Sequence, residues 1–132
     1  MSDWKRRALE ACPEIREDLE ATQSCMSAWF ELLPMVRQYE REEDNAKSLP
    51  IYSFARWCWD QPAHQNAVAV AFYEHLVDDV STLAVLPQRL STPKLFAALI
   101  PLFEQRISKK KLTALLTEYD KAHKTQFARN RS

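Results

Sequence analysis

The sequence of 132 residues contains no glycine. Average usage would place roughly nine glycines in a chain of this length. Only glycine adopts a positive φ freely, and phosphate-binding loops and tight hairpin turns depend on that backbone geometry. We therefore expect no backbone position that needs a positive φ. The absence argues against a P-loop, a dinucleotide-binding crossover and a hairpin-rich β fold, and it favours a helical protein.

Long apolar runs are also missing. The longest strongly apolar stretch, 67–73, ends at Glu74 and is far shorter than the roughly 20 residues that cross a bilayer. No apolar segment follows the basic residues at 5–7, so we expect no secretory signal. The sequence thus predicts a cytoplasmic protein without a membrane partner.

Cysteine is scarce and irregularly spaced. Cys12, Cys25 and Cys58 are an odd number and form no C-x-x-C motif, whereas disulfide frameworks and zinc ribbons use closely paired cysteines. We expect three free, mostly buried thiols that behave as small apolar side chains.

Composition fits one ordinary domain, because 46% of the residues are hydrophobic and the chain is long enough to bury a sizeable core. We expect a single helical domain over 1–124 and a polar, basic, frayed tail over 125–132. The net charge is zero, but residues 1–60 carry 8 basic and 12 acidic side chains, while 61–132 carry 10 and 6. This imbalance bears on partners rather than on the fold.

Prolines mark most of the expected helix boundaries, because proline is tolerated in the first turn of a helix. Pro34 and Pro101 fall inside expected helices and should kink or break them, and 83–89 should be a connector around Pro87. The sequence predicts an all-α, compact single-domain bundle of six to seven helices, several of them kinked or started by proline. The expected helices are 2–11, 13–21, 25–43, 50–60, 64–80, 93–107 and 108–123.

Four acidic residues crowd the end of the expected helix 25–43, where the helix macrodipole disfavours negative charge. They are Glu40, Glu42, Glu43 and Asp44. One interpretation is a solvated loop edge at which Arg41 and Lys47 reduce the repulsion. The other is a surface that meets a basic protein, because complementary charge speeds association and selects partners.

Trp57 and Trp59 stand near Tyr52 and Phe54 on one expected helix. Residues two apart lie about 200° apart around a helix axis, so these aromatic rings cannot all face one side. Core packing on both sides of the helix is one interpretation. An exposed aromatic anchor of the kind that dominates interfaces is the other.

Glu74, His75, Asp78 and Asp79 are the nearest approach to a metal or acid–base site, since i, i+4 spacing places them as neighbours on one helix. Neither Glu-x-x-His nor His-Glu-x-x-His occurs in the chain. The alternative is a helix end that turns to solvent, with His75 half-buried and the acids exposed. We expect no cofactor, no metal and no enzyme activity.

Lysines make the C-terminal end basic, beginning with Lys109, Lys110 and Lys111, which raises nucleic acid as a partner. No Trp or Phe is interleaved with the lysines over 109–124, and Glu118 and Asp120 interrupt them. A solvated helix face is therefore the favoured interpretation.

Four segments, in this order, resemble a group of small helical bacterial proteins of mostly uncharacterised function. They are SFARW at 53–57, VAFYEHL at 70–76, LP at 86–87 and LFAALIP at 95–101. The resemblance spans residues 12–119, and its matching positions are mainly apolar. Some members of the group are immunity proteins of toxin-delivery systems.

The resemblance implies a protein-binding inhibitor that covers the active site of a cognate toxin or blocks its assembly. It carries over no catalytic residue, and a homodimer stays open. The alternatives are a nucleic-acid-binding regulator that uses the basic C-terminal helix and a metal-dependent enzyme. The residues we expect to contact the partner are Glu40, Glu42, Glu43, Asp44, Trp57, Trp59, Asp78 and Asp79.

Overall fold

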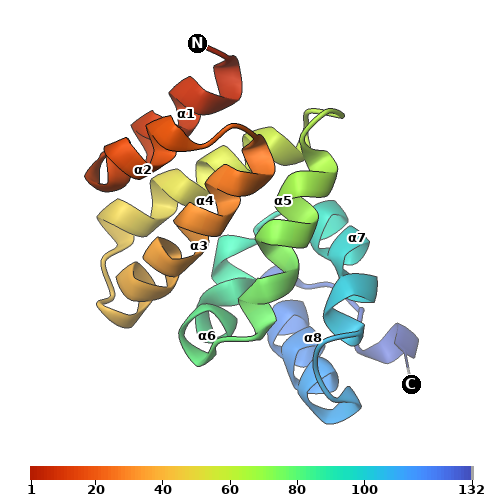
Figure 1. The fold of residues 1–132 in the computed structure, drawn as a ribbon. Helices are drawn as coiled ribbons and strands as arrows, with labels where there is room; N and C mark the ends of the chain where they lie inside the picture. The colour runs from red at the N-terminus through yellow and green to blue at the C-terminus, as the bar shows by residue number, and fades with distance from the viewer. Residues whose placement is uncertain (132) are drawn as a thin grey trace. The chain divides into compact units, whose positions relative to one another are not determined.

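The computed structural model describes residues 1–131, and these form eight α-helices, three short 3₁₀ helices and no strand (Figure 1). The α-helices are α1 Asp3–Ala11, α2 Arg16–Ala21, α3 Cys25–Arg41, α4 Asn45–Trp59, α5 Gln65–Ala71, α6 Val80–Arg89, α7 Pro93–Glu104 and α8 Lys109–His123. The 3₁₀ helices are η1 Pro13–Ile15, η2 Tyr73–Val77 and η3 Arg129–Arg131. The all-α prediction is confirmed.

The predicted count of six to seven helices is wrong, because the expected helix 64–80 is interrupted. Phe72 leaves helical geometry at φ −129° and ψ −70°, η2 follows, and a new helix begins after Asp79. The carboxylate of Asp79 caps α6 by accepting a hydrogen bond from the Ser81 amide at 2.9 Å. The expected connector 83–89 therefore lies inside α6, with Pro87 in the helix.

Prolines interrupt the helices less than the sequence suggests. Pro34 and Pro101 lie inside α3 and α7, and neither breaks its helix. The aromatic helix expected to begin at Pro50 begins instead at Asn45, because the Asp44 side chain accepts a hydrogen bond from the Lys47 amide at 3.2 Å and caps α4. A helix cap therefore sets this boundary rather than the proline.

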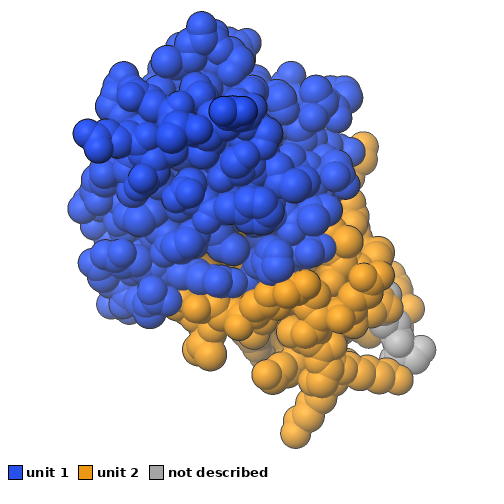
Figure 2. Space-filling model, viewed as in Figure 1, with its two compact units in different colours: residues 1–75 blue, residues 76–132 orange. Residues whose placement is uncertain are grey.

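The chain divides into two compact units, Met1–His75 and the segment from Leu76 onward (Figure 2). In unit 1, α3 packs against α4 and α5, and α1 packs against α4 (Figure 1). Trp29 on α3 is fully buried, and its ring lies 5.0 Å from Phe54 and 4.5 Å from Phe72 between centroids. This aromatic cluster is the centre of the unit 1 core. The single-domain expectation for 1–124 stays a prediction.

In unit 2, α8 packs against α6 and α7. Tyr119 of α8 and Phe96 of α7 stack with ring centroids 3.7 Å apart, and both are fully buried. The Tyr119 hydroxyl donates a hydrogen bond to the Leu90 carbonyl at 2.6 Å, and burial raises its pKa to about 12. The tyrosine therefore joins the end of α6 to the α7–α8 pair as a neutral donor.

Residues 125–128, expected to be part of a frayed tail, are held by Asp120 of α8. The Asp120 carboxylate accepts hydrogen bonds from the Thr125 hydroxyl at 2.5 Å and from the amides of Phe127 and Ala128 at 2.8 and 2.9 Å. Burial acts to raise the pKa of this carboxyl, but the three hydrogen bonds outweigh it and hold the pKa below its usual range.

Cys12, Cys25 and Cys58 are free and buried, as predicted. The sulfur atoms of Cys25 and Cys58 lie 3.8 Å apart in the unit 1 core. Among the described residues, no helix has both the length and the apolar character needed to cross a membrane.

Candidate protein-binding surface

Three of the four acids predicted at the end of α3 lie at the surface, and one does not. Glu42 and Glu43 are exposed, and Asp44 is half-buried. Glu40 is only 6% exposed and accepts a hydrogen bond from the Tyr52 hydroxyl at 3.0 Å. Including Glu40 in the contact surface is therefore not supported. A sequence signal existed, because Glu40 follows Val36 by one turn on the buried stripe of α3.

The α3–α4 turn holds Glu43 in the left-handed region, at φ 55°. Its amide donates to the Glu40 carbonyl at 3.1 Å, and the Asp44 amide donates to the Tyr39 carbonyl at 2.9 Å. These two bonds form a Schellman motif, whose left-handed residue is usually glycine. Glutamate there costs roughly 1–2 kcal/mol.

The expectation that this chain needs no positive φ is thus wrong. Two residues adopt it among those described, Glu43 and Lys124. Both stand at the end of a helix, and at Glu43 the backbone bonds to the last carbonyls offset the steric cost. Absence of glycine therefore did not exclude left-handed helix caps.

Glu14 of η1 joins these acids although it is distant in sequence. The Lys47 ammonium lies 2.7 Å from a Glu14 oxygen and 4.0 Å from an Asp44 oxygen. Both Lys47 and the Tyr39 hydroxyl, at 2.7 Å, donate to Glu14 and hold its pKa below the usual range. The same ion pair raises the pKa of Lys47. Sequence reasoning missed Glu14 because tertiary contact alone brings it here.

We call Glu14, Glu42, Glu43 and Asp44 the acidic surface. The carboxylates of Glu14 and Asp44 are held by Lys47 and by the cap of α4, and the Schellman motif fixes the backbone that carries Glu42 and Glu43. Tyr39, beneath it, is not set up for proton transfer, because burial and the bond to Glu14 raise its pKa. The arrangement presents negative charge on an ordered backbone, which suits recognition of a cationic partner.

Trp57 and Trp59 are half-buried on α4 and contact other rings of unit 1. The Arg7 guanidinium lies 4.5 Å from the Trp57 ring centroid, and the Phe54 ring lies 6.2 Å from it. Trp59 meets Tyr73 edge-on at 6.1 Å. The structure therefore favours packing on both sides of the helix for these residues over a freely exposed anchor.

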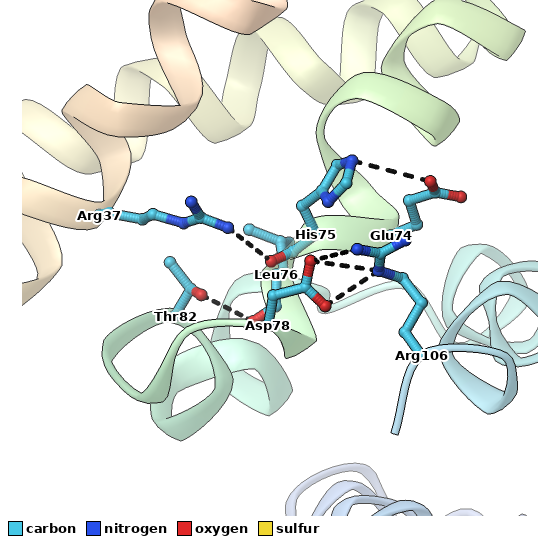
Figure 3. A network of polar contacts seen from close by, with 7 residues as sticks. All are labelled: Arg37, Glu74, His75, Leu76, Asp78, Thr82 and Arg106. Atoms are coloured by element: carbon cyan, nitrogen blue, oxygen red, sulfur yellow. Dashed lines mark hydrogen bonds and ion pairs between the residues drawn. The ribbon is translucent and has the colours of Figure 1, made fainter. Parts of the chain in front are cut away.

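The i, i+4 arrangement predicted for Glu74, His75, Asp78 and Asp79 does not form, because 73–77 is a 3₁₀ helix and 78–79 lie outside any helix. Asp78 accepts from the Arg106 Nε at 2.9 Å and from its Nη2 at 2.6 Å (Figure 3). Asp79 is the cap of α6. Both predicted contact residues thus have structural roles.

In unit 1, His75 Nε2 lies 3.7 Å from a Glu74 oxygen, and Arg37 donates to the His75 carbonyl at 3.3 Å (Figure 3). Within residues 1–131, no group of three or more His, Cys, Asp or Glu side chains is placed to hold a metal ion. The donor arrangement therefore gives no support to the metal-dependent alternative.

Comparisons with family models, with curated proteins and with solved structures gave no significant match. The resemblance to the helical bacterial group therefore stays a prediction, and the site must be judged by its own geometry.

Proposed function

We propose that this protein is a protein-binding inhibitor, an immunity protein that binds and neutralises a cognate bacterial toxin through the acidic surface. The observation that carries the proposal is Glu43. A glutamate occupies the left-handed turn position that glycine fills at lower cost. The surface thus keeps a carboxylate where stability alone favours its removal, which is typical of a functional position.

The charges around Glu43 support a basic partner. Unit 1 carries 13 acidic side chains against 8 basic ones, and Lys47 is already engaged by Glu14 and Asp44. Because Lys47 pairs with Glu14 and Asp44, a cationic surface can approach Glu42 and Glu43 without having to displace Lys47 from them. Such complementarity raises the association rate and selects against acidic proteins. Binding in this way inhibits by covering the toxin, so the inhibitor needs no catalytic group.

The proposal is tested by affinity purification from the native host, with the wild-type chain and with the variant E42Q/E43G as baits. This variant removes two charges, and glycine at 43 suits the turn, so a folding defect does not explain lost binding. The matched control is E31Q/D60N, which removes two exposed acids about three helical turns or more from the acidic surface along α3 and α4.

We expect a basic, toxin-like protein to be recovered with the wild type and the control and to be lost with E42Q/E43G. Co-expression with that protein should then protect cells only with the first two. Recovery of no toxin-like partner, or equal recovery with E42Q/E43G, would contradict the proposal.

Nucleic-acid binding is a second candidate, supported by Lys109, Lys110 and Lys111, which are exposed in the first turn of α8. Backbone charges of a nucleic acid would be met there by lysines and by the positive end of the helix. A salt-dependent gel shift that disappears in the variant K109E/K110E/K111E would favour this candidate over the inhibitor.

A further inference from the structure

An apolar groove lies between α6 and α8 within unit 2 and has a volume of about 540 Å³. Val80 and Leu83 of α6 and Leu115 of α8 contribute to its apolar lining, and Lys111, Glu118 and Lys121 of α8 are its charged residues. α6 and α8 lie side by side in unit 2 (Figure 1). Grooves between helices that combine an apolar lining with a few charged groups are common ligand sites.

Val80 shows that the groove continues into an open apolar surface. It is 85% exposed, the highest value among the large apolar side chains described. It is the first residue of α6, and the cap of that helix is made by Asp79, so Val80 contributes nothing to capping. Leu83, one turn later, is half-exposed. The two side chains form an apolar edge that folding of this chain leaves in water.

The charged residues of the groove favour a negatively charged occupant. Lys111 has no ion-pair partner among the described residues, and Lys121 pairs with Glu118 at 3.4 Å, with both side chains mostly exposed. An exposed pair of this kind contributes little to stability, so an incoming carboxylate can compete for Lys121. Unit 2 as a whole carries 10 basic side chains against 5 acidic ones.

The separation of the two lysines along α8 matches the length of a short helix. Lys111 and Lys121 are ten residues apart in one helix, which corresponds to about 15 Å along its axis. A helix of about three turns laid in the groove has the same length. Acidic residues near its two ends would reach the two lysines, and apolar residues one turn apart would meet Val80, Leu83 and Leu115.

We propose that the groove between α6 and α8 binds an amphipathic helix of another protein, with apolar residues at i, i+3 or i+4 and i+7 and with acidic residues at both ends. This is the helix-in-groove mode of recognition. The phosphates of a nucleic acid could pair with the lysines, but a nucleic acid would make no contact that requires the apolar lining. A second copy of this chain offers the acidic helix α2, which has six residues and whose Leu19 is fully buried, so it presents no apolar face.

The test is selection from a random library of 16-residue peptides displayed on phage, with the full chain as bait and counter-selection against V80D. We expect the enriched peptides to share apolar residues at helical spacing flanked by Asp or Glu. Binding of a synthetic copy should weaken by about tenfold or more in K111E/K121E, because each lysine there repels an acidic end. The control K109E/K110E carries the same charge change on residues outside the groove lining and should alter binding less than about threefold.

Charge reversal of the peptide separates recognition from folding. A peptide with Lys in place of its acidic residues should bind K111E/K121E better than it binds the wild type.

Absence of enrichment, enrichment that persists against V80D, or peptides without the acidic flanks would overturn the proposal. Concentration-dependent dimerisation that V80D abolishes would assign the groove to a second copy instead. Because the groove residues lie outside the acidic surface, E42Q/E43G should leave peptide binding unchanged. Failure of the proposed inhibitor function would therefore not decide whether the groove binds a helix.

Discussion

No sequence pattern predicts the structural role of Asp120. The sequence shows it as one acid interrupting a basic helix, whereas its carboxylate accepts three hydrogen bonds from Thr125, Phe127 and Ala128. Phe127 then lies 5.6 Å from Phe96 and 5.9 Å from Tyr119 between ring centroids. A single side chain thus fixes a segment that composition alone assigns to a frayed tail.

Replacing Asp120 with Asn should free that segment, because an amide oxygen accepts less strongly than a carboxylate and its nitrogen repels the backbone donors. We expect amide exchange at Phe127 and Ala128 to quicken by roughly tenfold at neutral pH, because the variant weakens one or two charge-assisted hydrogen bonds to these amides. Hydrogen exchange measured by NMR gives the rates. Exchange at Leu116, inside α8, is the internal control and should stay unchanged.

The same bonds predict a pH dependence. Since the folded pKa of Asp120 is depressed, its stabilisation is fully present above the unfolded value, near 4, and is lost as pH falls through the folded value. Wild-type exchange at 127–128 should therefore approach that of D120N in acid. Equal rates for both proteins at neutral pH would show that Asp120 does not hold the segment.

At the scale of elements, apolar periodicity predicted the interior of helices better than their ends. In α3, Trp29, Leu32, Leu33, Val36 and Tyr39 follow one another at intervals of one or three residues, as the apolar face of a helix does, and all five are buried. The same reasoning missed the break between α5 and α6, since apolar residues continue through it. There Thr82 donates from its buried hydroxyl to the Leu76 carbonyl at 2.6 Å, and a hydrogen bond of this kind leaves no trace in apolar spacing.

The cap at Asp79 can be tested as the cause of this boundary. Asp79→Ala should lower the free energy of unfolding by about 1 kcal/mol, whereas Asp79→Asn should cost less because asparagine also caps helices. Urea denaturation followed by circular dichroism measures the free energy of unfolding of both variants. The dependence of that free energy on urea concentration should have the same slope in each variant as in the wild type. If alanine and asparagine cost the same, the Asp79 side chain does not set the start of α6 by capping.

At the scale of the whole molecule, the charge imbalance seen in the sequence coincides with the division into units. The acidic surface belongs to unit 1, and the groove with its lysines belongs to unit 2. The sequence predicted the acidic turn in part, since Glu42, Glu43 and Asp44 are neighbours in the chain. It could not predict that Glu14 joins the acidic surface, because only tertiary packing brings Glu14 there. It could not predict the groove either, because most of α6 was expected to be a connector.

Two binding faces of different chemistry should respond differently to salt. The acidic surface binds through exposed charges, which are strongly screened as the Debye length falls from about 10 Å at 0.1 M to a few Å near 1 M. The groove combines two lysines with apolar burial, and the apolar part is not screened. Raising the salt should therefore weaken binding of the basic partner by a larger factor than binding of the acidic helical peptide.

Fluorescence anisotropy titrations of each ligand at low and high salt measure these two factors. The variants E42Q/E43G and K111E/K121E share no residue, so each should remove one binding event and leave the other, and their effects in the combined variant should add within roughly 0.5 kcal/mol. Equal salt dependence for both ligands would mean that charge alone holds the peptide, and the apolar lining of the groove would then play no part in recognition.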